Sequence, residues 1–544
     1  MSKVKIPLFE REATGLVRAI GPFGLMAISM SYAIGAGINF LAVDNGARYP
    51  GANVALAFII IGIPVILVGA CYALLAITMP RSGGAYLFIS RTLSPTWGFI
   101  ASWASWIGGW LLLGIISFYD VSFWGIMLVM VGKAFANPGL VGLGAWMQLE
   151  STSFWIGILL LASAAIISSL RTDWLIRTIQ ILWIIPIIGG LATMGIYAAN
   201  IGLTAATFAG KWDAIMGAGA FNEVMSVATA HGFDAAKFTT FSMDSTIGVA
   251  TYAAIFAYGS PATPSTSVAG EVKTPSRTQL IGTLGGVIAI VLWFTIMSGL
   301  MYASTDPFIR AYTFNFLNKY DSAYTLQPAI RPAVPLFAGI LSGNLPLATF
   351  MAASAAIWLY NDMPPFFIYL SRFTFAWSFD RSFPRVFAQV HPRLHTPLYS
   401  NILVFVLGVI ACALSTHGWI IYSYLPMLDQ LAAWFWIFPD WIVALVAIVI
   451  PIMREDIYKT SPAAAMTILG IPIISILGLG AFFGFTVIIF MMLGVLAPGG
   501  AASPEVMFIA GAFTVGLIIT LVEQYRTAKK GIPVREIFAA VPPE

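Results

Sequence analysis

The chain has 544 residues, of which 59% are hydrophobic and only 9% are charged, and its mean hydropathy is +0.88. A soluble domain carries charge on roughly a quarter of its residues, so this chain has too little charge to cover a soluble globule of its length. The composition excludes a water-soluble enzyme, a nucleic-acid-binding protein and a disordered chain. It predicts an all-α integral membrane protein, in which Cys71 and Cys412 pack as small apolar side chains rather than as a disulfide.

Twelve stretches are long and apolar enough to cross a bilayer, which takes about 20 residues per helix. Eleven of them contain no Lys, Arg, Asp, Glu or His, and one is interrupted by Asp429 and Asp440. We read 97–131 as a single long, tilted span that continues past Asp120, and 460–504 is long enough to include a re-entrant piece. In chain order, the predicted spans are 19–43, 49–80, 92–119, 154–170, 178–210, 245–270, 278–305, 332–361, 396–416, 425–453, 460–504 and 506–522.

The basic residues are distributed unevenly between the two sides that twelve spans define. An even number of spans places both termini on one side, and 20 of the 27 Lys and Arg residues fall on that side. Because basic loops stay in the cytoplasm, we expect a multi-pass protein of the plasma membrane with both termini cytoplasmic. The first apolar run continues beyond the length of a signal-peptide core, so no cleaved signal is expected.

Two spans contain clusters of glycine and proline where a continuous helix would be costly. In the sixth span, Pro261 and Pro264 each lack an N–H and clash with the preceding turn. In the first span, Gly35 and Gly37 allow backbone conformations that other residues resist. A proline kink and close packing through small residues are the simpler explanations. However, spans 1 and 6 each open a set of five helices, and paired interruptions of this kind indicate a transporter site near the bilayer midplane.

Short motifs, in a consistent order and spacing, resemble those of amino acid permeases of the amino acid–polyamine–organocation superfamily. Residues 34–38 resemble the glycine signature of the first helix, and 80–86 resemble the loop before helix 3. Residues 256–258 and 271–275 resemble the two ends of helix 6, and 371–393 resemble the loop after helix 8. The resemblance implies a LeuT-type fold with 12 transmembrane helices, built as a 5+5 inverted repeat followed by two extra helices.

The resemblance also implies where an amino acid would bind. Its carboxylate would meet amides of the first helix, and its ammonium would meet carbonyls of the sixth. The chain departs from the family at 259–263, where a Gly-Phe-acid sequence is usual, and its fifth span lacks the lysine of some proton-coupled members. The expected substrate-binding residues are Ile34, Gly35, Ala36, Gly37, Phe256, Ala257, Tyr258, Gly259 and Ser260.

The implied fold divides the chain into six parts. They are a cytoplasmic N-terminal segment (1–18), a first five-helix repeat (19–210), an extracellular loop (211–244), a second five-helix repeat (245–453), helices 11 and 12 (454–525) and a cytoplasmic tail (526–544).

Ionisable residues inside a bilayer are costly and indicate function. Asp362, at the end of the eighth span, is expected to bind a coupling cation or carry a proton, with a structural carboxylate as the alternative. Ser354 is a second candidate for an ion site. Glu271, Lys273 and Arg277 are expected to form an inner salt-bridge network that could act as a gate. The remaining acidic residues of the spans, expected nearer the membrane interfaces, are Asp120, Asp429 and Asp440.

Together these features predict a secondary transporter, not an enzyme, that moves amino acids by alternating access. A polyamine or organic cation carrier of the same fold is the alternative. A membrane-embedded enzyme or a channel fits less well, because the sequence has no His-Glu-x-x-His, P-loop or filter motif. The expected partners are an amino acid and the lipid bilayer. No catalytic residue, cofactor, metal site or nucleic-acid partner is expected. Proton or sodium coupling and the oligomeric state stay open.

Overall fold

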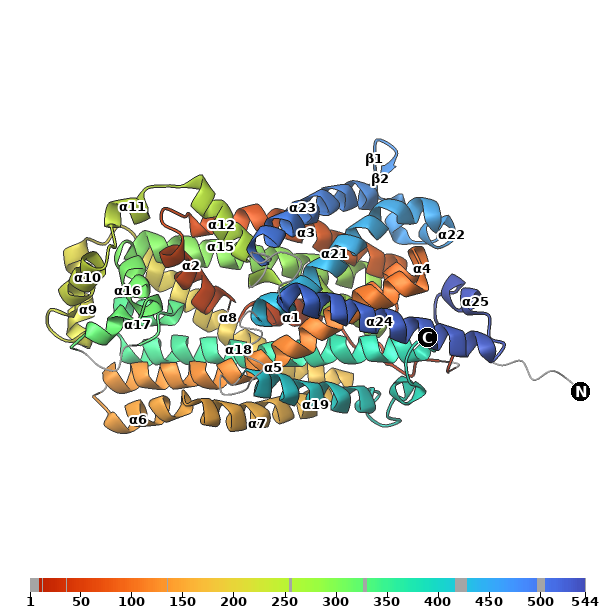
Figure 1. The fold of residues 1–544 in the computed structure, drawn as a ribbon, viewed down its shortest axis with the longest axis horizontal. Helices are drawn as coiled ribbons and strands as arrows, with labels where there is room; N and C mark the ends of the chain where they lie inside the picture. The colour runs from red at the N-terminus through yellow and green to blue at the C-terminus, as the bar shows by residue number, and fades with distance from the viewer. Residues whose placement is uncertain are drawn as a thin grey trace, which may run out of the picture.

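The computed structural model describes residues 9–11, 13–35, 37–134, 136–253, 257–325, 330–415, 428–496 and 504–543. Figure 1 shows an elongated bundle of helices. The main helices are α1 (Pro22–Ala33), η1 (Gly37–Leu41), α2 (Ala42–Arg48), α3 (Val54–Thr78), α4 (Gly84–Thr92), α5 (Pro95–Ala134), α7 (Glu150–Ser168), α8 (Thr172–Ala199), α12 (Met243–Ala253), α13 (Ala262–Ser267), α15 (Gly285–Thr305), α18 (Leu345–Phe379), α19 (Leu398–Leu414), α21 (Leu428–Met453), α23 (Ile473–Leu496) and α24 (Pro504–Lys529).

Shorter elements connect them. These are α6 (Pro138–Met147), α9 (Ala205–Met216), α10 (Ala220–Ala230), α11 (Ala235–Thr239), η3 (Ala269–Glu271), α14 (Pro275–Thr278), η4 (Gln279–Leu284), α16 (Phe308–Leu317), η5 (Tyr320–Ala323), α17 (Val334–Ser342), η6 (Arg385–Ala388), α22 (Glu455–Tyr458), η7 (Pro462–Ala465), a hairpin of β1 (Thr467–Ile468) and β2 (Ile471–Pro472), and α25 (Val534–Ala539).

Eight helices in the described residues are long and apolar enough to cross a membrane, or nine when the bent pair α1 and α2 is one span. The apolar α19 is shorter, and α18 and the broken pair α12 and α13 lie among these helices. An all-α membrane architecture is therefore confirmed, whereas the count of twelve spans stays a prediction.

The eighth and eleventh predicted spans differ from the observed helices. The eighth was expected at 332–361, but α17 and α18 are separate and α18 continues to Phe379. The expected span stopped at Asp362 because that residue is charged, yet α18 runs through Asp362 and through Arg372, whose charge is paired inside the protein. The long third span continues to residue 134, as expected. The eleventh begins at Ile473 rather than near 460, because the hairpin of β1 and β2 precedes it.

The two ends of the bundle are different (Figure 1). At one end, which we call the loop end, lie α9, α10, α11, α16 and α17. At the other, which we call the terminal end, lie α4, α22 and α25. Both described ends of the chain reach the terminal end: the Glu10 amide donates to the Phe379 carbonyl at 3.1 Å, and Arg81 Nε donates to the Pro542 carbonyl at 2.8 Å.

The centre of the bundle is formed by α18, which packs against α5, α8 and α1. From Asn361 to Ser378 its side chains are buried all round, including polar ones, so it is surrounded by protein rather than by lipid. Both broken helices lie beside this central helix, because α1 and α13 each contact α18. This arrangement puts the irregular backbone where it faces protein, as a membrane helix requires.

Candidate functional site

The first helix is interrupted in the middle of its span. The ladder of α1 ends at Ala33, a π-helical turn follows from Gly37, and the two halves are bent by 45°. The side-chain amide of Asn39 donates to the Gly35 carbonyl at 2.9 Å, so a side chain satisfies one of the backbone groups that the break frees. The expected site residue Ala36 lies outside the described residues.

The sixth helix is interrupted at the matching place. Helix α12 is described as far as Ala253, Ala257 and Tyr258 still have π-helical geometry, and after an irregular stretch α13 begins at Ala262. Gly259 has φ of +54°, in the left-handed region that favours glycine. After the break, the Thr263 amide donates to the Ser260 carbonyl at 3.0 Å, which starts the next helical segment. Both predicted breaks are therefore present, although the expected site residue Phe256 lies outside the described residues.

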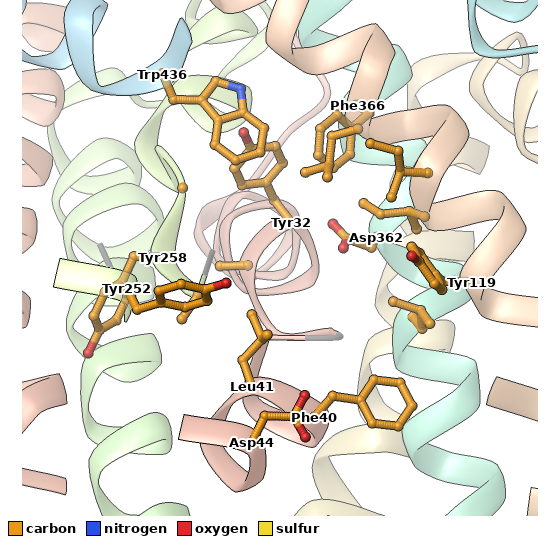
Figure 2. A pocket seen from close by; sticks show the side chains of 18 of the residues that line it. Tyr32, Phe40, Leu41, Asp44, Tyr119, Tyr252, Tyr258, Asp362, Phe366 and Trp436 are labelled. Atoms are coloured by element: carbon orange, nitrogen blue, oxygen red, sulfur yellow. The ribbon is translucent and has the colours of Figure 1, made fainter. Parts of the chain in front are cut away.

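A cavity of about 270 Å³ lies between the two breaks. Figure 2 shows Tyr252 and Tyr258 on one side of it and Asp362 and Tyr119 on the other, with Trp436 and Phe366 above and Asp44 and Phe40 below. Its size is close to the lower limit of about 300 Å³ for small-molecule pockets. The lining residues are Tyr32, Ala33, Gly37, Phe40, Leu41, Asp44, Arg48, Leu112, Ile115, Ile116, Tyr119, Tyr252, Ala257, Tyr258, Gly259, Arg331, Leu359, Asp362, Phe366 and Trp436.

The carboxylate of Asp362 is the main charge in the part of this cavity that lies away from the loop end. Its residue is only 5% exposed, and Oδ1 has no hydrogen-bond partner in the described part of the chain. Its Oδ2 lies beside the helix-1 break, 3.0 Å from where a Cβ on Gly35 would stand. Since unpaired carboxylates are costly inside a membrane, this one is available to a cationic group that enters the cavity.

The part of the cavity nearer the loop end has charges of both signs. Arg331 forms an ion pair with Asp44 at 3.3 Å, and its guanidinium stacks 4.1 Å from the centre of the Phe40 ring. Arg48 lies 5.8 Å from the centre of the Tyr252 ring. The side chains of Asp44, Arg48 and Arg331 form a partly exposed rim at the end of the cavity nearer the loop end.

The predicted binding residues are placed in different ways. Gly37, Ala257, Tyr258 and Gly259 line the cavity, although the Tyr258 hydroxyl points away and donates to the Phe58 carbonyl at 2.8 Å. Gly35 lies beside Asp362, since a Cβ added to it would stand 3.0 Å from Asp362 Oδ2. The other two predicted residues lie behind the wall: Ile34 lines a separate, smaller space, and Ser260 donates from its hydroxyl to Asp440.

The two predicted ion-site residues are not together. Asp362 lines the cavity. Ser354 lies earlier on α18 and faces Gly189 of α8 instead. A Cβ added to Gly189 would stand 2.2 Å from the Ser354 hydroxyl, so this serine occupies a tight contact between helices. Its role in ion binding stays a prediction.

The inner salt-bridge network differs from the expected one. Glu271 is fully buried and binds Arg372 through two hydrogen bonds, both of 3.0 Å, and it also accepts one from Thr172 at 3.1 Å. Lys273 and Arg277 are exposed and do not join this network in the described residues. The sequence prediction was wrong here because it placed Arg372 in a loop, whereas α18 carries it inside the bundle.

Sequence reasoning also missed several wall residues. Tyr32 lies just before the break in α1, and Phe366 and Trp436 belong to α18 and α21, so their residue types alone gave no signal. Asp440 was expected near an interface but is 1% exposed, directly behind the helix-6 break. An acidic residue one turn after Trp436 in an apolar span was the available clue.

Residues 20–519 match the sequence profile of a family described as amino acid permease. Cationic amino acid transporter 4 of Homo sapiens is 27% identical over 183 residues, which are 32% of this chain and 28% of that protein. The arginine/ornithine antiporter of Latilactobacillus sakei is 27% identical over 94 residues, which are 17% of this chain and 20% of that protein. The matched stretches thus span less than a third of these relatives.

The fold is similar to that of MhsT, whose crystal structure was determined in complex with L-phenylalanine. The TM-score is 0.54 at 15% sequence identity, over 87% of this chain and 99% of MhsT. At this identity the likeness concerns the fold alone, and it confirms the predicted LeuT-type fold class.

Proposed function

Because the chain belongs to the amino acid permease family, we propose that it is a secondary transporter that moves amino acids across a membrane by alternating access. The family is one of transporters, which agrees with the prediction that the chain is not an enzyme. The observation that carries the proposal is the cavity between the two broken helices, with the Asp362 carboxylate on its wall. A site of this kind at the midplane, between interrupted helices, is the usual arrangement in transporters of this architecture.

The two halves of the site suit the two charges of an amino acid. The first residues of η1, from Gly37, begin a new helical segment whose amides can donate to a carboxylate. On the opposite side, the carbonyls around Gly259 and the free oxygen of Asp362 can accept from an ammonium group. Aromatic rings of Tyr32 and Trp436 complete the wall and favour a substrate with an apolar or cationic portion.

The orientation of the protein follows from its charges. We expect the terminal end to face the cytoplasm, because 20 of the 27 Lys and Arg residues were assigned to that side. In this orientation the rim formed by Asp44 and Arg331 faces outward, so the cavity is reached from outside the cell. Location in the plasma membrane is part of the same proposal. The direction of net transport and the coupling ion are what the uptake experiment determines.

The test is uptake into proteoliposomes from a panel of labelled neutral and cationic amino acids and amines. Proton and sodium gradients are imposed separately. Saturable uptake of amino acids supports the proposal, and no uptake of any amino acid under either gradient contradicts it. The variant Gly37→Val is expected to abolish uptake while the protein remains folded, because a branched side chain would fill the cavity where η1 begins.

An organic cation or polyamine is the second candidate substrate. One observation favours such a substrate: the carboxylate of Asp362 lies beside the helix-1 break with an unpartnered oxygen. There the Asp362 carboxylate could take the place of the carboxylate that an amine substrate lacks. Uptake confined to amines, and lost in Asp362→Asn, would support this alternative. Uptake of amino acids that persists in Asp362→Asn would exclude it.

A further inference from the structure

We propose that Asp440 on α21 is a proton-binding site that controls the helix-6 break. When its carboxyl group is ionised, Asp440 holds the break through the hydrogen bond from Ser260. When that group is protonated, the bond weakens and the break is released. The proposal rests on the proposed transport function and adds the coupling ion, the proton, together with the group that binds it.

The geometry joins three helices at one carboxylate oxygen. Asp440 Oδ1 accepts hydrogen bonds from the Ser260 hydroxyl at 2.6 Å and from the Tyr72 hydroxyl at 2.8 Å. Thr263 extends the network, with its hydroxyl 2.7 Å from that of Ser260. Ser260 and Thr263 flank the start of α13, and Tyr72 belongs to α3. The second oxygen, Oδ2, has no hydrogen bond among the described residues and is therefore available to a proton.

This carboxylate lies directly behind the cavity wall. Ser260 follows Gly259, which lines the cavity. Trp436, one helical turn before Asp440, also lines the cavity, and its ring would be 3.4 Å from a Cβ on Gly259. A change in the bond between Asp440 and Ser260 thus acts on the backbone that we expect to bind the substrate.

No countercharge balances Asp440. It is 1% exposed, and none of the salt bridges in the described part of the chain includes it. Tyr72 is bonded to it and Tyr32 of α1 interacts with it; α23 carries no ionisable residue. The other ionisable residues on the elements packed against α21 are Cys71 on α3, Tyr86 and Arg91 on α4, Tyr119, Asp120 and Lys133 on α5, and Glu455, Asp456 and Tyr458 on α22.

The distances suggest how the switch works. Hydrogen bonds from a hydroxyl to an ionised carboxylate are about 2.5–2.7 Å long and roughly twice as strong as neutral ones, and the Ser260 bond is of this kind. A charge without a partner is costly within a membrane, so proton uptake relieves that cost and weakens the hold on Ser260. The proton adds to Oδ2 and no bond between heavy atoms forms or breaks.

The same distances favour a proton over a sodium ion. Oxygen ligands lie about 2.3–2.6 Å from a cation such as Ca²⁺, which has nearly the size of Na⁺, so neighbouring ligands stand more than ~3 Å apart. The oxygens around Asp440 are 2.6–2.8 Å apart, which is the spacing of direct hydrogen bonds.

The first experiment needs no substrate. Infrared difference spectra of the purified full chain are recorded across pH, and wild type is compared with Asp440→Asn. We expect a carboxylic-acid band in wild type that Asp440→Asn lacks. In Ser260→Ala and Tyr72→Phe, which keep the carboxyl group, we expect its pH midpoint to move by about one unit, corresponding to 1.36 kcal/mol. Identical spectra for wild type and Asp440→Asn would overturn the proposal.

The second experiment uses proteoliposomes and a substrate found in the uptake panel. A proton gradient is expected to stimulate wild-type uptake severalfold, and Asp440→Asn is expected to lose that response while it still exchanges substrate in counterflow. Asp120→Asn is the matched control, since Asp120 is also buried without a hydrogen-bond partner in the described residues but lies on α5. A response lost in Asp120→Asn and kept in Asp440→Asn would overturn the proposal, as would stimulation by sodium alone. If wild type transports nothing, the proposed function fails, whereas the infrared result stands by itself.

Discussion

The ion pairs on the two sides of the cavity differ in burial and geometry. At the terminal end, Arg372 and Glu271 are 1% and 0% exposed and share two hydrogen bonds, and Arg91 and Asp380 are 0% and 2% exposed. At the loop end, the pair of Arg331 and Asp44 has one contact of 3.3 Å, and Arg331 is 30% exposed. The pairs at the terminal end are dry and make several hydrogen bonds, whereas the pair that lines the cavity at the loop end is reached by water. The buried pair of Arg310 and Asp306 also lies at the loop end but does not line the cavity.

The terminal-end pair also ties the two broken helices together. The Glu271 carbonyl accepts from the amides of Ala19 and Ile20, just before α1, at 2.9 and 3.0 Å. The Lys273 amide in turn donates to the Ile20 carbonyl at 3.1 Å. The chain entering helix 1 and the chain leaving helix 6 are therefore fixed to each other and, through Arg372, to α18. We therefore expect the Glu271–Arg372 pair to separate if the cavity opens toward this end.

The largest effect is expected from Glu271→Gln. It leaves the Arg372 guanidinium buried without its carboxylate, and breaking a buried pair in this way costs about 3–5 kcal/mol. We expect a free energy of unfolding lower by that amount, measured by denaturation of the purified protein, together with loss of uptake. The double variant Glu271→Leu with Arg372→Met removes both charges and should recover most of the stability, but not uptake. A single variant as stable as wild type would contradict the importance of this closure.

A smaller effect is expected at the helix-1 break, between the two sides. In Gly35→Ala the added Cβ would stand 3.0 Å from Asp362 Oδ2 and 3.2 Å from Leu359 Cδ1, so the carboxylate must move. We expect substrate affinity to fall about tenfold, which is 1.4 kcal/mol, in equilibrium binding. Gly195→Ala on α8 is the matched control, since its Cβ would meet nothing within 4 Å, and it should bind as wild type does. Equal affinities for the two variants would remove Asp362 from the site.

The sequence was most informative where chain chemistry is local. The prolines at 261 and 264 and the glycines at 35 and 37 predicted both breaks, because missing N–H groups and missing Cβ atoms act within one turn of helix. Four of the nine predicted binding residues line the cavity for the same reason. The family motifs then supplied the fold class, which the apolar pattern alone does not determine.

The sequence was least informative where partners come from distant helices. Arg372 looked like a loop residue until Glu271, 101 residues earlier, was found beside it. Asp440 likewise depends on Tyr72, which is 368 residues away. A charged residue ends an apolar stretch when spans are predicted from hydropathy. A buried ion pair inside a helix therefore makes the predicted span too short and leaves the charged residues outside it.

The smallest effect is expected at the loop end, from Asp44→Asn. The substitution removes the buried member of the pair and leaves Arg331, which is 30% exposed and can be solvated, so the loss should be about 0–1 kcal/mol, the range of exposed pairs. We expect uptake to change less than fivefold, with the difference from wild type shrinking at high ionic strength. The reverse variant, Arg331→Gln, should cost more, because it removes the ion-pair partner of Asp44, which is 2% exposed. If Asp44→Asn instead abolished uptake as Glu271→Gln does, and salt made no difference, the two closures would be equivalent and the asymmetry drawn from burial would not describe the gates.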